Sequence, residues 1–292
     1  MLLQFVVSRS EPSELQAMRR RAFVTVAAAT TSAVAAPRAT AASSPKIGFA
    51  LGSGALHGWA HIGIVRGCAR IGLQPFAIAG SNVGAAIGAL WAAGLPVDEI
   101  VRIAHRFEWQ TAGALSLLGA RRRNDALREE IDRGVRGRSI ADLPVRFAAV
   151  ASDANSGESV ILDAGPVGLA VEASCAAPAA NEPVPIGKHR LLDGSLTAPV
   201  PVRAVRKLGA QRIVAVDVAY RPHEEAPSSS SDYAFQAVHI LTNTLAREQT
   251  SGAEHLIKLD VHHLMRKRLD VDALIDAGEA ALMKLAPVLV QK

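Results

Sequence analysis

Residues 78–94 of this 292-residue chain read IAGSNVGAAIGALWAAG, an order of residues typical of a turn built for nucleophilic chemistry. An apolar run ends at Gly80, and an alanine-rich segment of helical character follows Gly84. In hydrolases, the pattern Gly-x-Ser-x-Gly places a nucleophilic serine on a sharp turn between a strand and a helix. Here the middle position holds Asn82, and the serine stands one place earlier, at Ser81.

Asparagine at this position is compatible with the shape of such a turn but not with its chemistry. The central residue of a nucleophile elbow adopts a positive φ, which asparagine tolerates better than most residues. The neighbouring positions must be small, and Gly80 and Gly84 meet that condition. A carboxamide nitrogen has a delocalised lone pair and cannot attack an ester. The turn can therefore keep its form at Asn82 while lacking its nucleophile.

Two further segments hold residues suited to the same kind of reaction. In LGSGALHGWAHIG, residues 51–63, glycines follow a predicted strand, and their N–H groups can converge on an anion. The spacing of these glycines differs from the dinucleotide-binding pattern. In HRLLDGSLTAPVPV, residues 189–202, Asp193 stands in an Asp-Gly turn at a strand end, where a carboxylate can act as a general base. Each segment by itself also fits an ordinary turn.

Together and in this order, the three segments resemble the patatin-like phospholipase family, and in particular its bacterial single-domain members. The resemblance runs from Ala50 to about residue 220 and weakly through the C-terminal helix. It includes IADLPVRFAAVASDANSGE, ASCAAP at 173–178 and RIVAVDV. It implies a Ser–Asp dyad without histidine, in which the elbow serine attacks a lipid ester, an aspartate takes the proton and the glycine loop holds the oxyanion. Carried over by position, Asp193 is the base, Asn82 occupies the nucleophile position, and the oxyanion loop comprises Gly52, Ser53 and Gly54.

The chain departs from the family pattern at more than the elbow. His57 stands where the family usually has an arginine, and residues 179–182 are less apolar than is usual after ASCAAP. These departures favour a catalytically impaired pseudoenzyme that still binds an acyl lipid or its headgroup. Two alternatives remain open: an active esterase that uses Ser81 or a water held by Asp193, and a non-enzymatic interaction protein. Since adjacent residues of an extended chain project to opposite sides, the hydroxyl of Ser81 is expected to point away from Asp193.

Short apolar runs alternate with helical segments from residue 46 onward, which predicts an α/β fold. The sheet is expected to be mostly parallel, with helices on both faces in three layers. Strands are predicted at 46–51, 75–80, 145–152, 158–163, 211–218 and 254–259, and helices at 58–71, 84–94, 97–108, 124–135, 166–175, 231–249 and 271–286. Asn124 is the expected N-cap of its helix, and residues 155–157 are the expected hairpin turn.

The overall charge argues against a nucleic-acid-binding surface. The net charge is +5, but residues 1–41 hold five Arg against two Glu, so the rest of the chain carries only about +2. A nucleic-acid-binding face needs clustered basic residues. The sequence predicts no cofactor and no metal site, because the histidine pair at 262–263 has no partner pattern. The expected partner is a lipid or acyl-ester ligand or a membrane surface, and the sequence does not determine an oligomeric state.

The first 45 residues are interpreted as an extension and a targeting segment rather than as part of the fold. Residues 18–36 read MRRRAFVTVAAATTSAVAA, a basic start followed by an apolar stretch and small residues. This order resembles a twin-arginine export signal of bacteria. The sequence therefore predicts a periplasmic protein whose single domain covers residues 46–292. If the targeting interpretation is wrong, the expected location is the cytoplasm.

Overall fold

The computed structural model describes residues 45–114, 121–178, 181–219, 229–261, 264 and 270–290. The predicted targeting segment at 18–36 lies outside these residues. From Ser43 onward the chain forms one compact unit.

Strands and helices alternate along the described chain, as the sequence predicts. The strands are β1 (Ile47–Leu51), β2 (Ala77–Ser81), β3 (Arg146–Asp153), β4 (Ser159–Leu162), β5 (Val184–Ile186), β6 (His189–Leu192), β7 (Arg212–Asp217) and β8 (His255–Lys258). The α-helices are α1 (Ala60–Arg70), α2 (Val83–Ala92), α3 (Val97–Ala114), α4 (Arg121–Val135), α5 (Val167–Ser174), α6 (Val202–Lys207), α7 (Ser230–Thr250) and α8 (Val271–Leu289). Three short 3-10 turns are η1 (Ala55–Trp59), η2 (Ile140–Asp142) and η3 (Gly194–Leu196).

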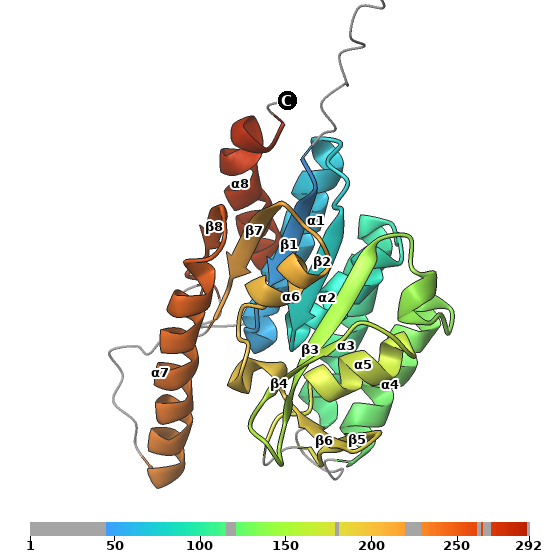
Figure 1. Ribbon diagram of the computed structural model, residues 1–292, viewed down its shortest axis with the longest axis vertical. Coiled ribbons are helices and arrows are strands. Elements are labelled where there is room, and N and C mark those ends of the chain that lie inside the picture. Colours follow the sequence, from blue (N-terminus) through green and yellow to red (C-terminus); the bar gives the residue numbers. More distant parts are fainter. Residues whose placement is uncertain are drawn as a thin grey trace, which may run out of the picture. The chain divides into compact units, whose positions relative to one another are not determined.

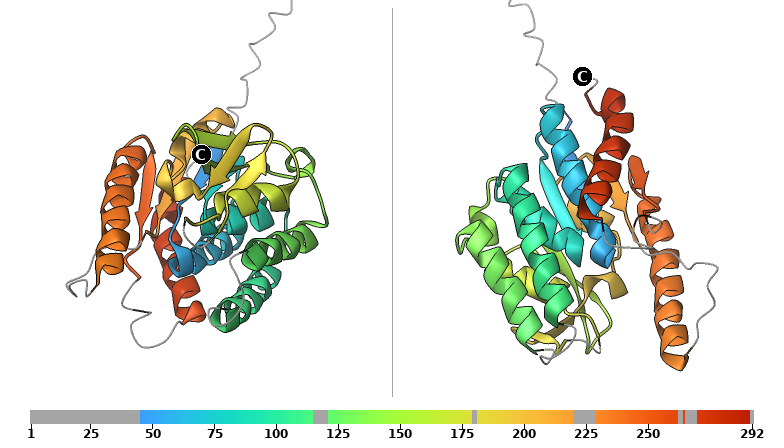
Figure 2. Two further views of the ribbon diagram at one scale, coloured as in Figure 1. Left: turned by 90° about the horizontal axis from the view of Figure 1, so that it is seen from below. Right: turned by 180° about the vertical axis from the view of Figure 1, so that it is seen from behind.

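The strands form one sheet in the order β5-β6-β3-β2-β1-β7-β8, and β4 pairs with β3 beside this path. Strands β3, β2, β1, β7 and β8 are parallel, whereas β4, β5 and β6 join by antiparallel pairing. Helices cover both faces of the sheet (Figures 1 and 2). The predicted three-layer α/β fold with a mostly parallel sheet is confirmed. In a parallel sheet the strands end together, so the residues that follow β1 and β2 meet at one carboxyl edge.

The two faces of the sheet are packed with side chains of different size. On one face, large residues such as Phe49, Leu51 and Phe147 pack against α1–α5 and α8. On the other face, Ala50, Ala79 and other small residues lie under α6 and the end of α7. Alternation along each strand separates these two sets. Small residues allow α6 to approach the sheet closely, since no bulky side chain stands between them.

Three details differ from the sequence prediction. The strand β5 and the short helix α6 were not expected as separate elements, because runs of three to six residues carry little periodicity. Asn124 lies inside α4 and is not its N-cap, since the helix begins at Arg121. Arginine is a good helix former, which permits the earlier start. Among the described helices, none is both long and apolar enough to span a bilayer.

Candidate active site

The turn between β2 and α2 has the geometry of a nucleophile elbow. Asn82 has φ 55° and ψ −127° and is the N-cap of α2. A Cβ added to Gly80 would lie 2.2 Å from the carbonyl oxygen of Gly84, and one added to Gly84 would lie 2.2 Å from that of Leu51. Side chains at either glycine would thus collide with backbone. The close contact between Gly84 and Leu51 brings the elbow against the end of β1.

The side chains of Asn82 and Asp193 are in direct contact. Asn82 Nδ2 donates a hydrogen bond of 2.6 Å to Asp193 Oδ2, although 111 positions separate the two residues in sequence. Asp193 follows β6 and caps η3, where its Oδ1 accepts a hydrogen bond of 2.8 Å from the N–H of Ser195. Its backbone is fixed as well, because its N–H donates to Ala176 and its carbonyl accepts from the Ser152 hydroxyl at 2.8 Å. The carboxylate therefore faces position 82 from a rigid turn.

Burial alters the acidity of this carboxyl group. The pKa of Asp193 is raised above its usual value because burial disfavours its charged form. The hydrogen bonds from Ser195 and Asn82 act in the opposite direction. Burial and the charge of Asp193 also raise the pKa of the nearby Cys175 thiol, so this cysteine is not an activated nucleophile. A carboxylate with a raised pKa is a stronger base than one in water, which suits proton abstraction.

Ser174 supports the elbow from α5, a role that no local pattern in the sequence predicts. The N–H of Asn82 donates to Ser174 Oγ at 3.0 Å, and this hydroxyl donates to the Val150 carbonyl at 2.5 Å. Ser174 is fully buried, so water cannot replace it. It stands in the ASCAAP segment at 173–178, whose place next to the elbow only the fold reveals. Ser174 thus satisfies the N–H of Asn82, a backbone donor that has no partner within α2.

Ser81 is unsuited to act as the nucleophile. Its side chain is fully buried, and its hydroxyl has no hydrogen-bond partner within the described part of the chain. The hydroxyl packs against Gly194, where an added Cβ would lie 2.7 Å from Ser81 Oγ. No hydrogen bond joins this oxygen to Asp193. An ester substrate could not reach Ser81 without opening the sheet.

The glycine loop after β1 reaches the same edge of the sheet. The N–H of Gly52 donates to the Val216 carbonyl at 2.9 Å, and the N–H of Ser53 donates to the Pro199 carbonyl at 2.8 Å. Two of the three donors predicted for an oxyanion are therefore already used. The N–H of Gly52 continues the pairing of β1 with β7, and the N–H of Ser53 bonds to the segment between η3 and α6. Over the described residues, the N–H groups of Gly54 and Ala55 have no acceptor. These two groups are the donors that a bound oxyanion could take.

His61, in α1, supports this loop through a hydrogen bond to its backbone, a role that the sequence did not reveal. Its Nε2 lies 2.8 Å from the carbonyl oxygen of Gly52, and the side chain is fully buried in α1. Burial lowers the pKa of His61 from 6.5 to about 4, so the imidazole is neutral near pH 7. A neutral imidazole that donates from Nε2 has an acceptor at Nδ1, and this atom has no partner in the described chain. His61 thus fixes the position of Gly52 rather than acting as a base.

His57, which the resemblance places where an arginine is usual, belongs to η1 beside the elbow. Only 4% of its surface is exposed, and its N–H donates to the Gly54 carbonyl at 2.9 Å. A Cβ on the next residue, Gly58, would lie 2.0 Å from the side chain of Val83, which follows Asn82. η1 is therefore in tight contact with the start of α2. This packing places His57 close to both the glycine loop and the elbow.

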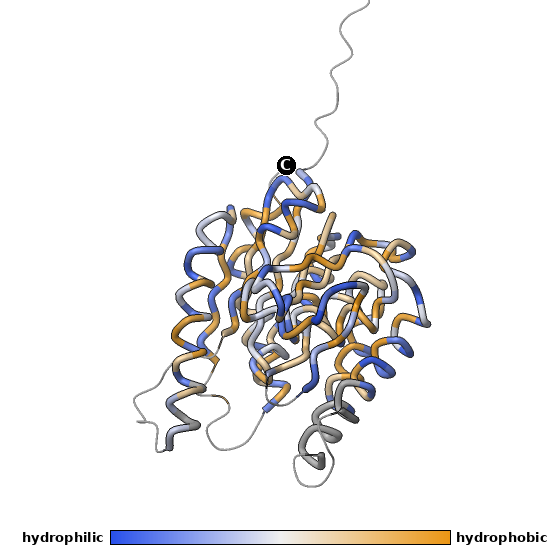
Figure 3. The backbone as a smooth tube through the Cα atoms, turned by 60° about the horizontal axis from the view of Figure 1, so that its bottom comes forward, coloured by the Kyte–Doolittle hydropathy of each residue, from blue (hydrophilic) through white to orange (hydrophobic). Residues whose placement is uncertain are grey.

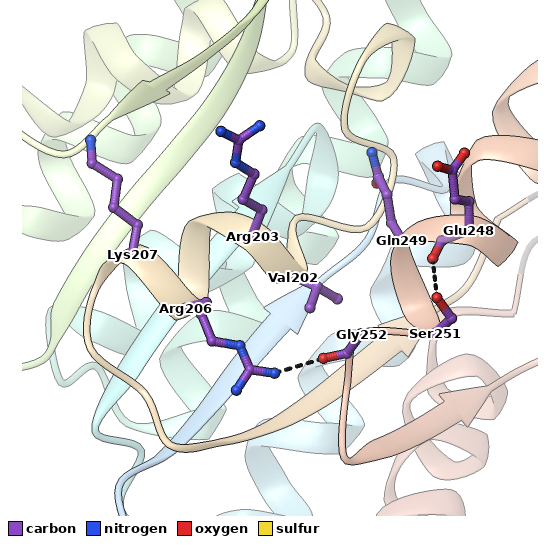
Figure 4. Close-up of a pocket in the computed structure, with 8 residues that line it drawn as sticks. All are labelled: Val202, Arg203, Arg206, Lys207, Glu248, Gln249, Ser251 and Gly252. Atoms are coloured by element: carbon purple, nitrogen blue, oxygen red, sulfur yellow. Dashed lines mark hydrogen bonds between the residues drawn. The ribbon is translucent and has the colours of Figure 1, made fainter.

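Other polar groups in the described chain lie outside this site. Asp153 Oδ2 and His189 Nδ1 are joined by a hydrogen bond of 2.7 Å, and this contact lowers the pKa of Asp153. Figure 4 shows a groove between α6 and the end of α7, in which Arg206 donates to the Gly252 carbonyl at 2.7 Å. Arg206 also pairs with Glu254, and Lys207 pairs with Asp163. No group of three or more metal-ligating side chains occurs among the residues that the structure describes.

A sharp turn at the end of a parallel strand, facing a buried carboxylate, is the arrangement of an acyl hydrolase with a nucleophile and a single base. The family model of the patatin-like phospholipases matches residues 49–206 of the chain. The chain therefore belongs to the patatin-like phospholipase family.

The relatives of the chain include longer proteins. An uncharacterized NTE family protein of Mycobacterium tuberculosis is 33% identical over 194 residues, which cover 64% of this chain and 52% of that protein. Neuropathy target esterase sws of Drosophila melanogaster is 25% identical over 201 residues, which cover 64% of this chain and 14% of that protein. The chain thus spans about half the length of the mycobacterial protein and a much smaller share of the Drosophila protein. VipD from Legionella pneumophila, a solved structure, aligns with a TM-score of 0.49 at 11% identity over 84% of this chain and 67% of VipD.

Proposed function

We propose that this protein is a catalytically impaired lipid acyl hydrolase that retains the binding site of its family for an acyl ester. The 2.6 Å contact between Asn82 Nδ2 and Asp193 Oδ2 carries the proposal. The amide occupies the position from which a serine would attack, and it donates to the carboxylate that would take the proton. The base is thereby held in place without a hydroxyl to deprotonate.

The geometry supports the reaction that a serine at position 82 would perform. Its Oγ would attack the ester carbonyl carbon, Asp193 would accept the hydroxyl proton, and Gly54 and Ala55 would donate to the oxyanion. Serine Oγ lies one bond closer to the backbone than Asn82 Nδ2, so the carboxylate must approach by about 1 Å to reach it. A shift of this size is within the adjustment that active sites make when substrate binds.

Two alternative functions have less support. An esterase that uses Ser81 would need a hydroxyl that is accessible, whereas Ser81 is fully buried. A water activated by Asp193 would share a carboxylate whose two oxygens already accept hydrogen bonds from Asn82 and Ser195. A purely protein-binding role does not account for a buried carboxylate that is aimed at the elbow.

Restoring the nucleophile tests the proposal. The variant Asn82→Ser should hydrolyse p-nitrophenyl esters, with a turnover at least about a thousandfold above that of the original chain, since removal of a serine nucleophile costs on the order of a million-fold. Esters of several acyl lengths would show which chain length the site prefers.

Two matched variants show whether the gain uses the dyad. Asn82→Ala removes the amide without adding a hydroxyl and should stay inactive, and Asn82→Ser with Asp193→Asn should lose the gain because its base is neutral. Robust activity in the original chain that Asp193→Ala abolishes would refute impairment. If the folded Asn82→Ser protein showed no gain, the loop at Gly54 would not be a working oxyanion site.

A further inference from the structure

Helix α7 directs four large apolar side chains away from the body of the protein. Their exposed fractions are 60% for Tyr233, 42% for Val238, 50% for Ile240 and 69% for Leu241. Tyr233, Ile240 and Leu241 are seven and eight positions apart and share one side of the helix, and Val238 lies at the margin of that side, three positions before Leu241. A row of exposed apolar side chains on one helix is a candidate contact surface.

The inner side of the same helix is more polar than its outer side. Asn243, Ala246 and Thr250 are buried, and His239 is half-buried. Burial lowers the pKa of His239, so this residue is neutral near pH 7. Residues 233–246 contain no Asp, Glu, Lys or Arg. An ordinary surface helix has the opposite arrangement, with charged residues facing water.

The apolar side of α7 lies at the carboxyl edge of the sheet, the edge that carries the candidate site. Strand β8 is parallel to β7, so α7 must run from the carboxyl edge back toward the start of β8. The end of α7 is fixed to the body by Gln249, which donates to Thr197 and accepts from Val200. The preceding turns extend past the ends of the strands (Figure 1), and hydrophobic and hydrophilic stretches alternate along α7 in Figure 3.

The size of the surface decides between two occupants. The exposed stretch from residue 233 to 244 is about 18 Å long and about 10 Å wide. It offers on the order of 200 Å², whereas a stable dimer buries about 800 Å² on each partner. A second copy of the chain would therefore find too little area. A lipid surface needs only a row of apolar side chains without charge that it can bury at the headgroup boundary.

We propose that the outer side of α7 docks on a lipid surface and holds the carboxyl edge, with Asn82 and Asp193, against the lipid. This inference rests on the proposed function for the nature of the ligand. Tyr233, Val238, Ile240 and Leu241 enter the boundary between headgroups and acyl chains. The lack of ionic side chains on this part of α7 lets the helix lie there without desolvating a charge.

Flotation with vesicles tests the surface without requiring catalysis. The full chain is incubated with vesicles of phosphatidylcholine, alone or mixed with phosphatidylglycerol, and its bound fraction is measured. The double variant Ile240→Gln/Leu241→Gln should lower the partition coefficient at least about tenfold, since two large apolar side chains leave the interface. Glutamine is a good helix former, so α7 should persist in this variant.

The matched control is Val288→Gln/Val290→Gln, which removes two exposed apolar side chains at the end of α8, near the start of β7. The control should bind like the original chain. Equal binding by all three proteins, or an equal loss in both variants, would overturn the proposal. The oligomeric state of the same samples is measured by sedimentation. If the original chain and the control were dimers and only the α7 variant were a monomer, the surface would bind a second copy of the chain and the proposal would be overturned. Hydrolysis of a soluble short-chain ester by Asn82→Ser tests the site separately, so failure of the surface and failure of the site are distinguishable.

Discussion

The elbow at Asn82 and the glycine loop at Gly54 lie against each other, yet their backbones are held in different ways. At the elbow, the Asn82 N–H donates to Ser174, its carbonyl accepts from Ala85, and its amide donates to Asp193. In the loop, the N–H groups of Gly54 and Ala55 have no acceptor over the described residues. The elbow thus holds its strained shape without a serine, whereas the loop keeps two backbone donors that no described group of the chain satisfies.

The largest expected effect concerns His61, which holds the loop but not the elbow. Its pKa is lowered from 6.5 to about 4 in the folded protein, so the unfolded chain takes up the proton first as pH falls. The contribution of neutral His61 to the free energy of unfolding is therefore fully present above pH 6.5. As the pH falls to 4, the free energy of unfolding decreases by about 3 kcal/mol. The variant His61→Gln can still donate to Gly52 but does not titrate.

Urea unfolding of both proteins at pH 7, 5 and 4 checks this prediction. The free energy of unfolding of the original chain should fall relative to that of His61→Gln as the pH decreases. The raised pKa of Asp193 acts in the opposite direction, but it is common to both proteins and cancels in the difference. Parallel pH curves would mean that His61 is not the neutral, buried support of the loop.

A smaller effect is expected at Ser174, which holds the elbow but not the loop. Ser174→Ala leaves the Asn82 N–H and one contact of the Val150 carbonyl unsatisfied, which should lower the free energy of unfolding by about 1–2 kcal/mol. In the Asn82→Ser background the same change should also lower kcat, because the turn loses its fixed position.

Ser139→Ala is the matched control, since Ser139 donates to the Gly165 carbonyl at the surface and should cost less than about 0.5 kcal/mol. A loss of stability at Ser174 without any change in kcat would limit its role to folding.

The smallest effect is a gain in stability at Ala55, in the loop. This exposed residue has φ 45°, a strained value for alanine. Ala55→Gly should raise the free energy of unfolding by about 0.5–1 kcal/mol, since glycine adopts this conformation freely. Arg136→Gly, at φ 57° after α4, provides a reference away from the site. A loss of stability at Ala55 with a gain at Arg136 would show that the alanine methyl is needed to shape the loop.

The sequence predicted the fold better than it predicted the supports of the site. The alternation of strands and helices and the sharp turn at Asn82 were correct, because apolar periodicity and glycine spacing are local properties. The helix α6 and the strand β5 were not predicted, since each is too short to show a period. Ser174 and His61 were not assigned their roles, because nothing local marks a serine or histidine as the partner of a distant backbone group.

The sequence by itself determined an α/β chain with a bend at position 82, no hydroxyl at that bend, and an aspartate that could serve as its base. Only the tertiary structure decided that Asn82 and Asp193 touch across 111 positions, that Ser81 is buried, and that the N–H groups of Gly52 and Ser53 are already used. The physical reason is that residue type and local spacing fix what a group can do. Pairing of β1 with β7 and packing of α5 beneath the elbow fix which groups meet, and these contacts join segments far apart in the chain.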